Sequence, residues 1–354
     1  MGMDDRFAYG VDTGWLSQLE QQGYTFEDEN GEVCDALAIL KKMGANAYRQ
    51  RVFVDPPSSG FWEKRKNEIC MTGFCDTSEA VKQAKRAQDL GFRILIDAHY
   101  SDFFADPDFQ IMPEAWKYDS LETLKARVYQ HTQDILQAMR RADVHVDQFQ
   151  VGNEINNGMM HPVGRFPEQA EALAVLINSG YAAVKDASPD TEVVTHLASI
   201  ERREEIEAFY DTFFANGGMT DVLGFSYYPF WHMRQTNRED YEHPLSWYLN
   251  AYYVKYRKPV IIAEIGEKYT EPQKTYDLLR DAVEALRNMP DGAGRGIYYW
   301  EPEAPAEVLP DRYPLGAAVM SGERTIRFTK AMRAYSAQGQ ITGKCRAKPR
   351  DFYV

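Results

Sequence analysis

Short apolar runs alternate with longer amphipathic segments along most of this 354-residue chain. Two of the short runs end in the same way. In Asp147–Glu154 the apolar residues Phe149 and Val151 alternate with polar ones before the run stops at Gly-Asn-Glu. In Pro259–Glu264 a continuous apolar run stops at a glutamate. Runs of this kind are typical of strands buried in a parallel sheet, so both predict a strand that presents a carboxyl group at its end.

The alternation of strand and helix repeats eight times. We predict strands at Phe7–Asp12, Ala45–Phe53, Phe92–His99, Asp147–Glu154, Glu192–His196, Val222–Tyr228, Val260–Glu264 and Gly296–Trp300. We predict helices at Val33–Met43, Ser78–Leu90, Leu121–Arg141, Pro167–Asp186, Arg202–Ala215, Leu245–Tyr256, Gln273–Asn288 and Thr325–Ala337. Glycines directly follow the first two helices, as expected of helix ends. Eight such units predict an α/β fold, a single (β/α)8 TIM barrel.

The chain shows no linker and no shift in composition that would divide it. We therefore assign residues 1–339 to one catalytic barrel domain and residues 340–354 to a short basic C-terminal extension. The formal net charge of −13 argues against nucleic acid or an anionic membrane as a partner. The first residues carry no apolar signal segment, which leaves the cellular location open between the cytoplasm and secretion. We expect a monomer.

Aromatic residues make up 13% of the chain, including 22 Tyr and 6 Trp. They fit either a tyrosine-rich core or a cleft that binds sugars, since aromatic rings pack against sugar rings. The four cysteines are too few for a disulfide scaffold in a chain of this length. Cys70 and Cys75 lack a second Cys/His pair for zinc, and they fit either a loop disulfide or two free thiols.

Chemically active side chains gather at the predicted carboxyl ends of the strands, where TIM barrels place their active sites. From these positions we expect substrate-binding roles for Arg51, His99, Asp102, Asn153, Tyr228, Trp231 and Trp300. Asn153 would hydrogen-bond a sugar 2-hydroxyl and Trp300 would form a flat floor under the reacting ring. A metal hydrolase would need several His ligands, and only His99, His196 and His232 are available, so we predict no metal and no cofactor.

Glu154 and Glu264 end two strands of the same barrel, and this pair favours catalysis over a structural role. A protonated carboxyl can give its proton to a glycosidic oxygen while an ionised one attacks the anomeric carbon; this is the chemistry of a retaining glycosidase. The two pKa values must then differ, with a cation lowering the pKa of the nucleophile. Arg51, at the end of the second strand, is the candidate cation, although it could equally be a structural arginine of the barrel.

Several longer runs carry a family resemblance. They are Arg49–Pro56, the His-Tyr-Ser-Asp…Ala-Asp-Pro segment within Asp97–Pro107, Val151–Ile155, Phe225–Trp231 and Gly296–Pro302. From about Phe7 to Gln338 the chain resembles glycoside hydrolase family 53, the arabinogalactan endo-β-1,4-galactanases. The resemblance implies a retaining hydrolase of β-1,4-galactan or derived galacto-oligosaccharides. It also implies that Glu154 is the acid/base and Glu264 the nucleophile.

The chain departs from the family pattern at three aromatic positions. Phe104 stands where the family usually has Trp, Met160-His161 replaces Leu-Trp, and Glu303-Ala304 replaces Ala-Trp. We expect these changes to alter the binding of distal sugars rather than the core chemistry. Two alternatives remain: a retaining barrel glycosidase for another β-linked glycan, and a sugar-binding barrel without catalysis. Endo and exo action are not distinguished by the sequence.

Overall fold

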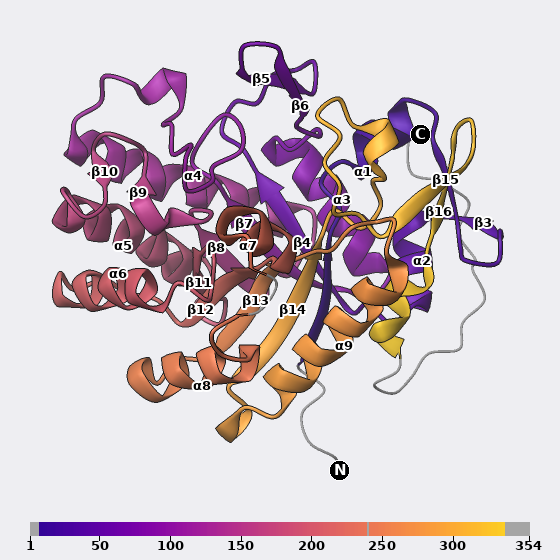
Figure 1. Cartoon of the computed structure of the whole chain (residues 1–354). Coiled ribbons are helices and arrows are strands. Elements are labelled where there is room, and N and C mark those ends of the chain that lie inside the picture. Colours follow the sequence, from indigo (N-terminus) through magenta and orange to yellow (C-terminus); the bar gives the residue numbers. More distant parts are fainter. Residues whose placement is uncertain (1–6, 239–240, 337–354) are drawn as a thin grey trace.

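The computed structural model describes residues 7–238 and 241–336, and the proposed C-terminal extension of residues 340–354 lies outside them. Eight parallel strands form a closed barrel in the order β1-β4-β7-β8-β11-β12-β13-β14, and β14 pairs with β1 to close it. Helices surround the strands (Figure 1). The predicted TIM barrel is therefore confirmed.

The barrel strands agree closely with the predicted ones. Their bounds are β1 Ala8–Asp12, β4 Ala47–Val52, β7 Arg93–Ala98, β8 Gln148–Val151, β11 Glu192–Leu197, β12 Val222–Tyr227, β13 Val260–Ile265 and β14 Gly294–Trp300. The main outer helices are α2 Ala36–Lys42, α3 Thr77–Asp89, α4 Leu121–Arg141, α5 Ala170–Ala187, α6 Arg203–Ala215, α8 Leu245–Tyr256 and α9 Pro272–Arg287. Within the described ranges every helix is too short or too polar to cross a membrane.

The alternation of side chains along each strand separates two cores. On β7, Ile94 and Ile96 face the helices, whereas Leu95 belongs to a smaller cluster inside the barrel. The same parity directs Asp97 inward at the carboxyl end of β7. The inward-facing side chains of such a strand therefore fill the barrel interior near its amino end. At its carboxyl end the strand presents polar side chains to the mouth of the barrel.

The last predicted helix is wrong. Thr325–Ala337 contains strand β16 Thr325–Phe328 and the 3₁₀ helix η5 Lys330–Ala334. Strand β16 joins β15 Ala318–Gly322, β2 Thr25–Glu27 and β3 Val33–Cys34 in a four-stranded sheet beside the barrel. The alternating Ile326 and Phe328 are both fully buried, which is the pattern of a strand with one buried face.

The first predicted helix also began too early, because Val33–Cys34 is β3 and Asp35 is the N-cap of α2. The Asp35 side chain accepts a hydrogen bond from the Ala38 backbone N–H, which favours a helix start at this residue.

A β-hairpin occupies the segment between β4 and α3, where we predicted neither a strand nor a helix. Its strands are β5 Phe61–Arg65 and β6 Glu68–Met71, and it stands at the carboxyl end of the barrel, at the top of Figure 1. Cys70 and Cys75 near the hairpin are both buried free thiols, so no disulfide links them.

The remaining elements are short. They are the helices α1 Leu16–Gln21 and α7 Pro229–Thr236, the two-stranded pair β9 Gly158–Met159 and β10 Gly164–Arg165, and the 3₁₀ helices η1 Glu114–Trp116, η2 Ile155–Asn157, η3 Pro290–Gly292 and η4 Ala306–Val308. Most of them lie in segments that follow a barrel strand, and these segments shape the barrel mouth.

Candidate active site

The carboxyl ends of the strands enclose a cavity of about 860 Å³. Its lining includes both glutamates singled out from the sequence, Glu154 and Glu264, and also His99, Asn153, Tyr228, Trp231 and Trp300. Two predicted substrate-binding residues, Arg51 and Asp102, are not part of the lining. A cavity of this size suits a small chain of sugars.

Glu154 reaches the cavity through a tight turn after β8. Gly152 has a φ of +79° and Glu154 has a φ of +47°, and a Cβ at Gly152 would lie 2.8 Å from Ile155 Cγ2. A left-handed backbone at a residue other than glycine is uncommon and often marks a functional site. The Ser226 hydroxyl donates a hydrogen bond to Glu154 Oε1.

Glu264 lies on β13, where the strand pairing becomes irregular. Ser226 of β12 pairs with Glu264, whereas the preceding pair is Phe225 with Ile262, so Ala263 is an extra residue. Such a bulge re-aims the following side chain, and here it directs Glu264 into the cavity. Because Ser226 both pairs with Glu264 and holds Glu154, it brings the two carboxyl groups to one place.

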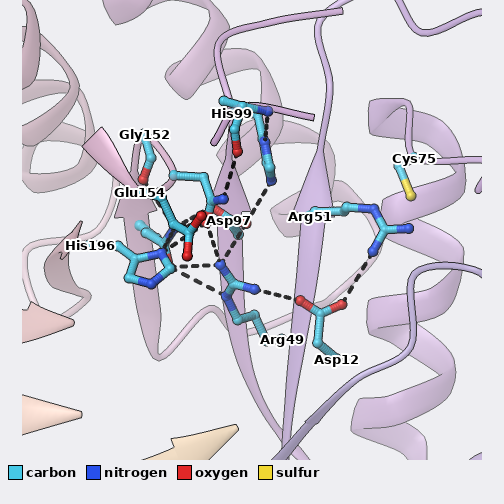
Figure 2. Close-up of polar contacts among 12 residues, drawn as sticks. Asp12, Arg49, Arg51, Cys75, Asp97, His99, Gly152, Glu154 and His196 are labelled. Atoms are coloured by element: carbon cyan, nitrogen blue, oxygen red, sulfur yellow. Dashed lines mark hydrogen bonds and ion pairs between the residues drawn. The ribbon is translucent and has the colours of Figure 1, made fainter. Parts of the chain in front are cut away.

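The cation beside Glu264 is Arg49, and the prediction of Arg51 for this position is wrong. Arg49 Nη1 lies 3.1 Å from Glu264 Oε1 and 2.7 Å from Asp12 Oδ2, and Arg49 Nη2 lies 2.8 Å from Asp97 Oδ2. Figure 2 shows the Arg49 guanidinium between Asp12 and Asp97. One buried guanidinium therefore faces three carboxyl groups.

Arg51 is buried on the far side of Asp12 from Arg49 (Figure 2). It forms an ion pair with Glu301 and donates a hydrogen bond to the Thr72 carbonyl over 2.9 Å. Both arginines face inward from β4, since residues 49 and 51 share a face of the strand. Which of the two reaches Glu264 depends on depth in the barrel, and the sequence does not reveal this depth.

Asn153 and two histidines form a hydrogen-bond network beneath Glu154. Asn153 Oδ1 accepts hydrogen bonds from Arg49 Nη2 over 2.8 Å and from Gln150 Nε2 over 3.0 Å. His196 joins Asn153 Oδ1 and the Ser226 hydroxyl, each over 2.9 Å. His99 Nε2 lies 2.9 Å from Asp97 Oδ2. These contacts fix the orientation of the side chains under the cavity.

Asp102 contributes to the loop rather than to the cavity. Its carboxylate accepts hydrogen bonds from the backbone N–H groups of Asp55 and Glu114 over 3.1 and 2.9 Å. It therefore connects the segments that follow β4 and β7. In residues 7–238 and 241–336, no group of three His, Cys, Asp or Glu side chains is placed to hold a metal ion.

An aromatic cluster forms one side of the cavity. Trp300 packs edge-on against Trp15 with ring centroids 5.2 Å apart and against Tyr313 at 4.8 Å. Phe104 contacts Trp300 at 6.3 Å and also lines the cavity. Trp15 and Tyr313 were not among the predicted binding residues; Trp15 lies only three residues after β1, but no periodicity signalled Tyr313.

Of the three departures from the family pattern, only the one at Phe104 lies in the cavity lining. Glu303 and Ala304 are fully buried away from it, and Met160 and His161 are also outside the lining.

Burial and negative charge raise the pKa values of both glutamates. Burial raises the pKa of Glu154 to about 7, and the hydrogen bond from Ser226 opposes this rise. Burial also raises the pKa of Glu264, with Arg49 opposing the rise and the charge of Glu154 adding to it. Because each ionised carboxyl raises the pKa of the other, the pair readily holds a single proton near neutral pH.

Glu264 has the stronger set of partners for the ionised form. Besides the ion pair with Arg49, Glu264 Oε2 accepts a hydrogen bond from the Tyr228 hydroxyl over 3.0 Å. Both contacts favour a carboxylate. The arrangement suits proton donation by Glu154 and nucleophilic attack by Glu264.

Comparisons with known proteins match this architecture. The solved structure of a fungal β-1,4-galactanase superposes with a TM-score of 0.77 at 22% identity, covering 93% of this chain and 98% of that one. The catalytic domain of a family 53 glycoside hydrolase from Ignisphaera aggregans also has a TM-score of 0.77, at 27% identity, and covers 94% of this chain and 96% of that domain. The likeness to the fungal galactanase shows that the two proteins share a fold.

Sequence comparisons extend the likeness to the family. An endo-β-1,4-galactanase of Bacillus subtilis is 32% identical over 85% of this chain and 71% of its own length. An arabinogalactan endo-β-1,4-galactanase A of Aspergillus niger is 31% identical over 83% of this chain and 84% of its own length. The family model described as glycosyl hydrolase family 53 matches residues 8–335. The chain is therefore a glycoside hydrolase that belongs to glycosyl hydrolase family 53, as its motifs predicted.

Proposed function

We propose that this chain hydrolyses β-1,4-galactosidic bonds of galactan or of galacto-oligosaccharides with retention of configuration. The observation that carries the proposal is the pair of carboxyl groups in one cavity, Glu154 and Glu264, of which only Glu264 forms an ion pair with Arg49. The named relatives supply the substrate class, since those from Bacillus subtilis and Aspergillus niger are endo-β-1,4-galactanases.

The first step forms a covalent intermediate. The Glu264 carboxylate attacks the anomeric carbon while the bond from this carbon to the glycosidic oxygen breaks. The electron pair of the broken bond goes to the oxygen, and Glu154 gives that oxygen its proton. Arg49 and the Tyr228 hydroxyl hold the Glu264 carboxyl in the ionised form before attack.

The second step releases the sugar. Glu154, now ionised, takes a proton from a water molecule, and the water oxygen attacks the same anomeric carbon. The ester bond to Glu264 breaks, and the carboxylate and the protonated Glu154 are restored. Two inversions at one carbon give net retention.

Five further residues of the lining are proposed to bind the reacting sugar: His99, Asn153, Tyr228, Trp231 and Trp300. Arg51 and Asp102 are proposed to act indirectly, because Arg51 holds Thr72 and Glu301 while Asp102 joins two loops. They would position the mouth of the barrel rather than contact the sugar.

Release of reducing sugar from pectic galactan, mannan, xylan and cellulose tests the proposal. We expect activity on galactan, and loss of this activity in both Glu154→Gln and Glu264→Gln with an unchanged circular dichroism spectrum. Activity on xylan but not on galactan would favour a glycosidase for another β-linked glycan. Binding of galactan without cleavage by the unmodified chain would favour a sugar-binding barrel.

A further inference from the structure

The inner face of the β5–β6 hairpin forms part of the cavity wall. Lys64, Glu68 and Cys70 line the cavity, whereas Phe61, Glu63 and Ile69 on the other face are exposed to solvent. Alternate residues of a strand point to opposite faces, so one face of the hairpin is turned toward the catalytic glutamates. The hairpin therefore forms part of the wall of the site.

The hairpin is joined to the loop after β7 by an ion pair between two residues that line the cavity. Lys64 Nζ lies 2.8 Å from Asp106 Oδ2 in the loop after β7. Cys70 and Asp311, which lies in the segment after β14, also line the cavity. The hairpin and the two segments beside it therefore form the wall at this end of the cavity.

Further contacts hold the inner face and the base of the hairpin. The Trp62 ring stacks on Phe103 with centroids 3.8 Å apart and planes 10° apart. The Met71 carbonyl, at the end of β6, accepts a hydrogen bond from Trp15 Nε1 over 2.6 Å. The next residue, Thr72, is held by Arg51 through its carbonyl. These contacts favour a fixed wall rather than a flap.

The walled end lies on the side of the sugar that is transferred to Glu264. The acid must stand beside the leaving group, and Glu154 follows β8 together with Asn156 and Asn157, which also line the cavity. The hairpin lies instead with Trp15 and the segment after β14, next to the cluster around Trp300. Beyond Glu154 the lining continues to exposed residues such as Arg202 and Glu205, so the leaving-group side opens to solvent.

We propose that the β5–β6 hairpin limits how many sugars fit beyond the reacting bond, so that the chain removes one short product of fixed length from the non-reducing end. The proposal rests on the galactanase function proposed above and names the specificity-determining element of that site. Lys64 and Trp62, with their partners Asp106 and Phe103, hold the wall in place. A sugar chain that continues past the wall would collide with the hairpin backbone.

Product analysis over time on galactan tests the wall. For the unmodified chain we expect one short product from the first time point, reducing ends that rise while viscosity falls little, and no cleavage of oligosaccharides blocked at the non-reducing end. In a shortened hairpin, residues 63–69 are replaced by Gly-Gly, which keeps the Trp62–Cys70 pair across a two-residue turn. This variant should release mixed lengths and lower the viscosity faster for each bond cut.

A second variant guards against misfolding of the shortened hairpin. Lys64→Ala removes the ion pair with Asp106 and leaves the backbone intact, so we expect partial appearance of mixed products. Lys82→Ala is the matched control, because it removes an exposed ion pair with Glu79 on α3, away from the cavity. Its product pattern should equal that of the unmodified chain.

Two outcomes overturn the inference while leaving galactan hydrolysis intact: mixed lengths released early by the unmodified chain, or a single product still released by a folded chain with the shortened hairpin. Absence of any cleavage of galactan would instead overturn the proposed function, and this inference with it.

Discussion

Arg49 determines the charge balance of the site at the scale of single residues. Its guanidinium is buried and contacts carboxyl oxygens of Asp12, Asp97 and Glu264. An arginine stays charged in proteins and offers several fixed donors, which a lysine cannot replace. Burial raises the pKa values of Glu154 and Glu264, the neighbouring carboxyl charges add to this rise, and Arg49 opposes it.

The pH dependence of kcat/KM follows from this shared proton. The active form has Glu154 protonated, so kcat/KM should fall as pH rises through about 7, the value to which burial raises the pKa of Glu154. The Ser226 hydroxyl stabilises ionised Glu154 and lowers its pKa. Ser226→Ala should therefore raise this pKa and move the alkaline limb to higher pH.

Measurement of kcat/KM between about pH 4 and pH 9 for the unmodified chain and for Ser226→Ala checks this shift. Carboxyl groups with raised pKa values titrate within this range. An alkaline limb that stays in place or moves to lower pH in Ser226→Ala would contradict the assignment of Glu154 as the acid.

Tyr228 should matter for rate because its hydroxyl holds the nucleophile. Tyr228→Phe removes the 3.0 Å hydrogen bond to Glu264 Oε2. A hydrogen bond to a charged group contributes about 1.5–3 kcal/mol, so kcat should fall about 10- to 100-fold. Tyr269→Phe is the matched control, since it removes a 2.9 Å bond from a tyrosine to Glu307 outside the cavity. Equal kcat values for the two variants would remove Tyr228 from the mechanism.

The sequence placed Glu154 and Glu264 at the barrel mouth, where the cavity is, but it chose the wrong cation for Glu264. Glu154 and Glu264 each end an apolar run, and this local signal was enough to find them. The choice between Arg49 and Arg51 failed because both face inward on β4, and only the heights of neighbouring strands decide which one meets Glu264. Tyr313 belongs to an irregular segment after β14, where no periodicity marks a side chain as part of a site.

Helices and strands whose apolar residues follow one clear period were predicted well. Elements whose apolar pattern is short or mixed were not. Helix α4 Leu121–Arg141 has the predicted bounds because Ser120 caps it and its apolar residues follow a helical period. The β5–β6 hairpin was missed because its outer face exposes the apolar residues Phe61 and Ile69 to solvent. The usual alternation of buried apolar and exposed polar residues is therefore hidden.

The ion pairs at the junction of α2 and α3 can be tested for their contribution to stability. Arg86 of α3 is buried and forms ion pairs with Glu20 and with Asp35, the N-cap of α2. Arg86→Ala would leave Asp35 buried without this cation, and removal of one partner of a buried pair costs about 3–5 kcal/mol of unfolding free energy. Urea denaturation should show this loss.

Lys85→Ala, one residue away on the same helix, is the control. It removes only the exposed pair with Asp89, and such a pair contributes about 0–1 kcal/mol. Similar denaturation midpoints for the two variants would show that the buried ion pairs contribute little to stability.

The molecule as a whole joins the two ends of its described chain through the four-stranded sheet. β16 pairs with β2, and Phe26 and Phe328 are buried with ring centroids 6.0 Å apart. Phe328→Ala should lower the unfolding free energy by about 3–5 kcal/mol through the cavity that it leaves. Tyr118→Ala, at a residue that is 92% exposed, is the control. Thermal melts of equal midpoint would contradict a structural role for this sheet.

The arrangement of the barrel explains why residues 110 positions apart in sequence can act on one bond. Parallel strands bring their carboxyl ends to one rim, so each strand can contribute one side chain to a shared cavity. Loops then set how much of the sugar chain fits. The ends of the strands position the catalytic pair, and the β5–β6 hairpin sets the length of the product.

The central claim is that Glu264 becomes covalently bonded to the sugar. A 2-deoxy-2-fluoro-β-galactoside with a good leaving group slows both steps, and the intermediate then accumulates when departure of the leaving group is the faster step. Mass spectrometry of peptides from the treated protein should show the fluorosugar on the peptide that contains Glu264, with fragmentation that places it on this residue. A fluorosugar attached to any other residue would contradict the account.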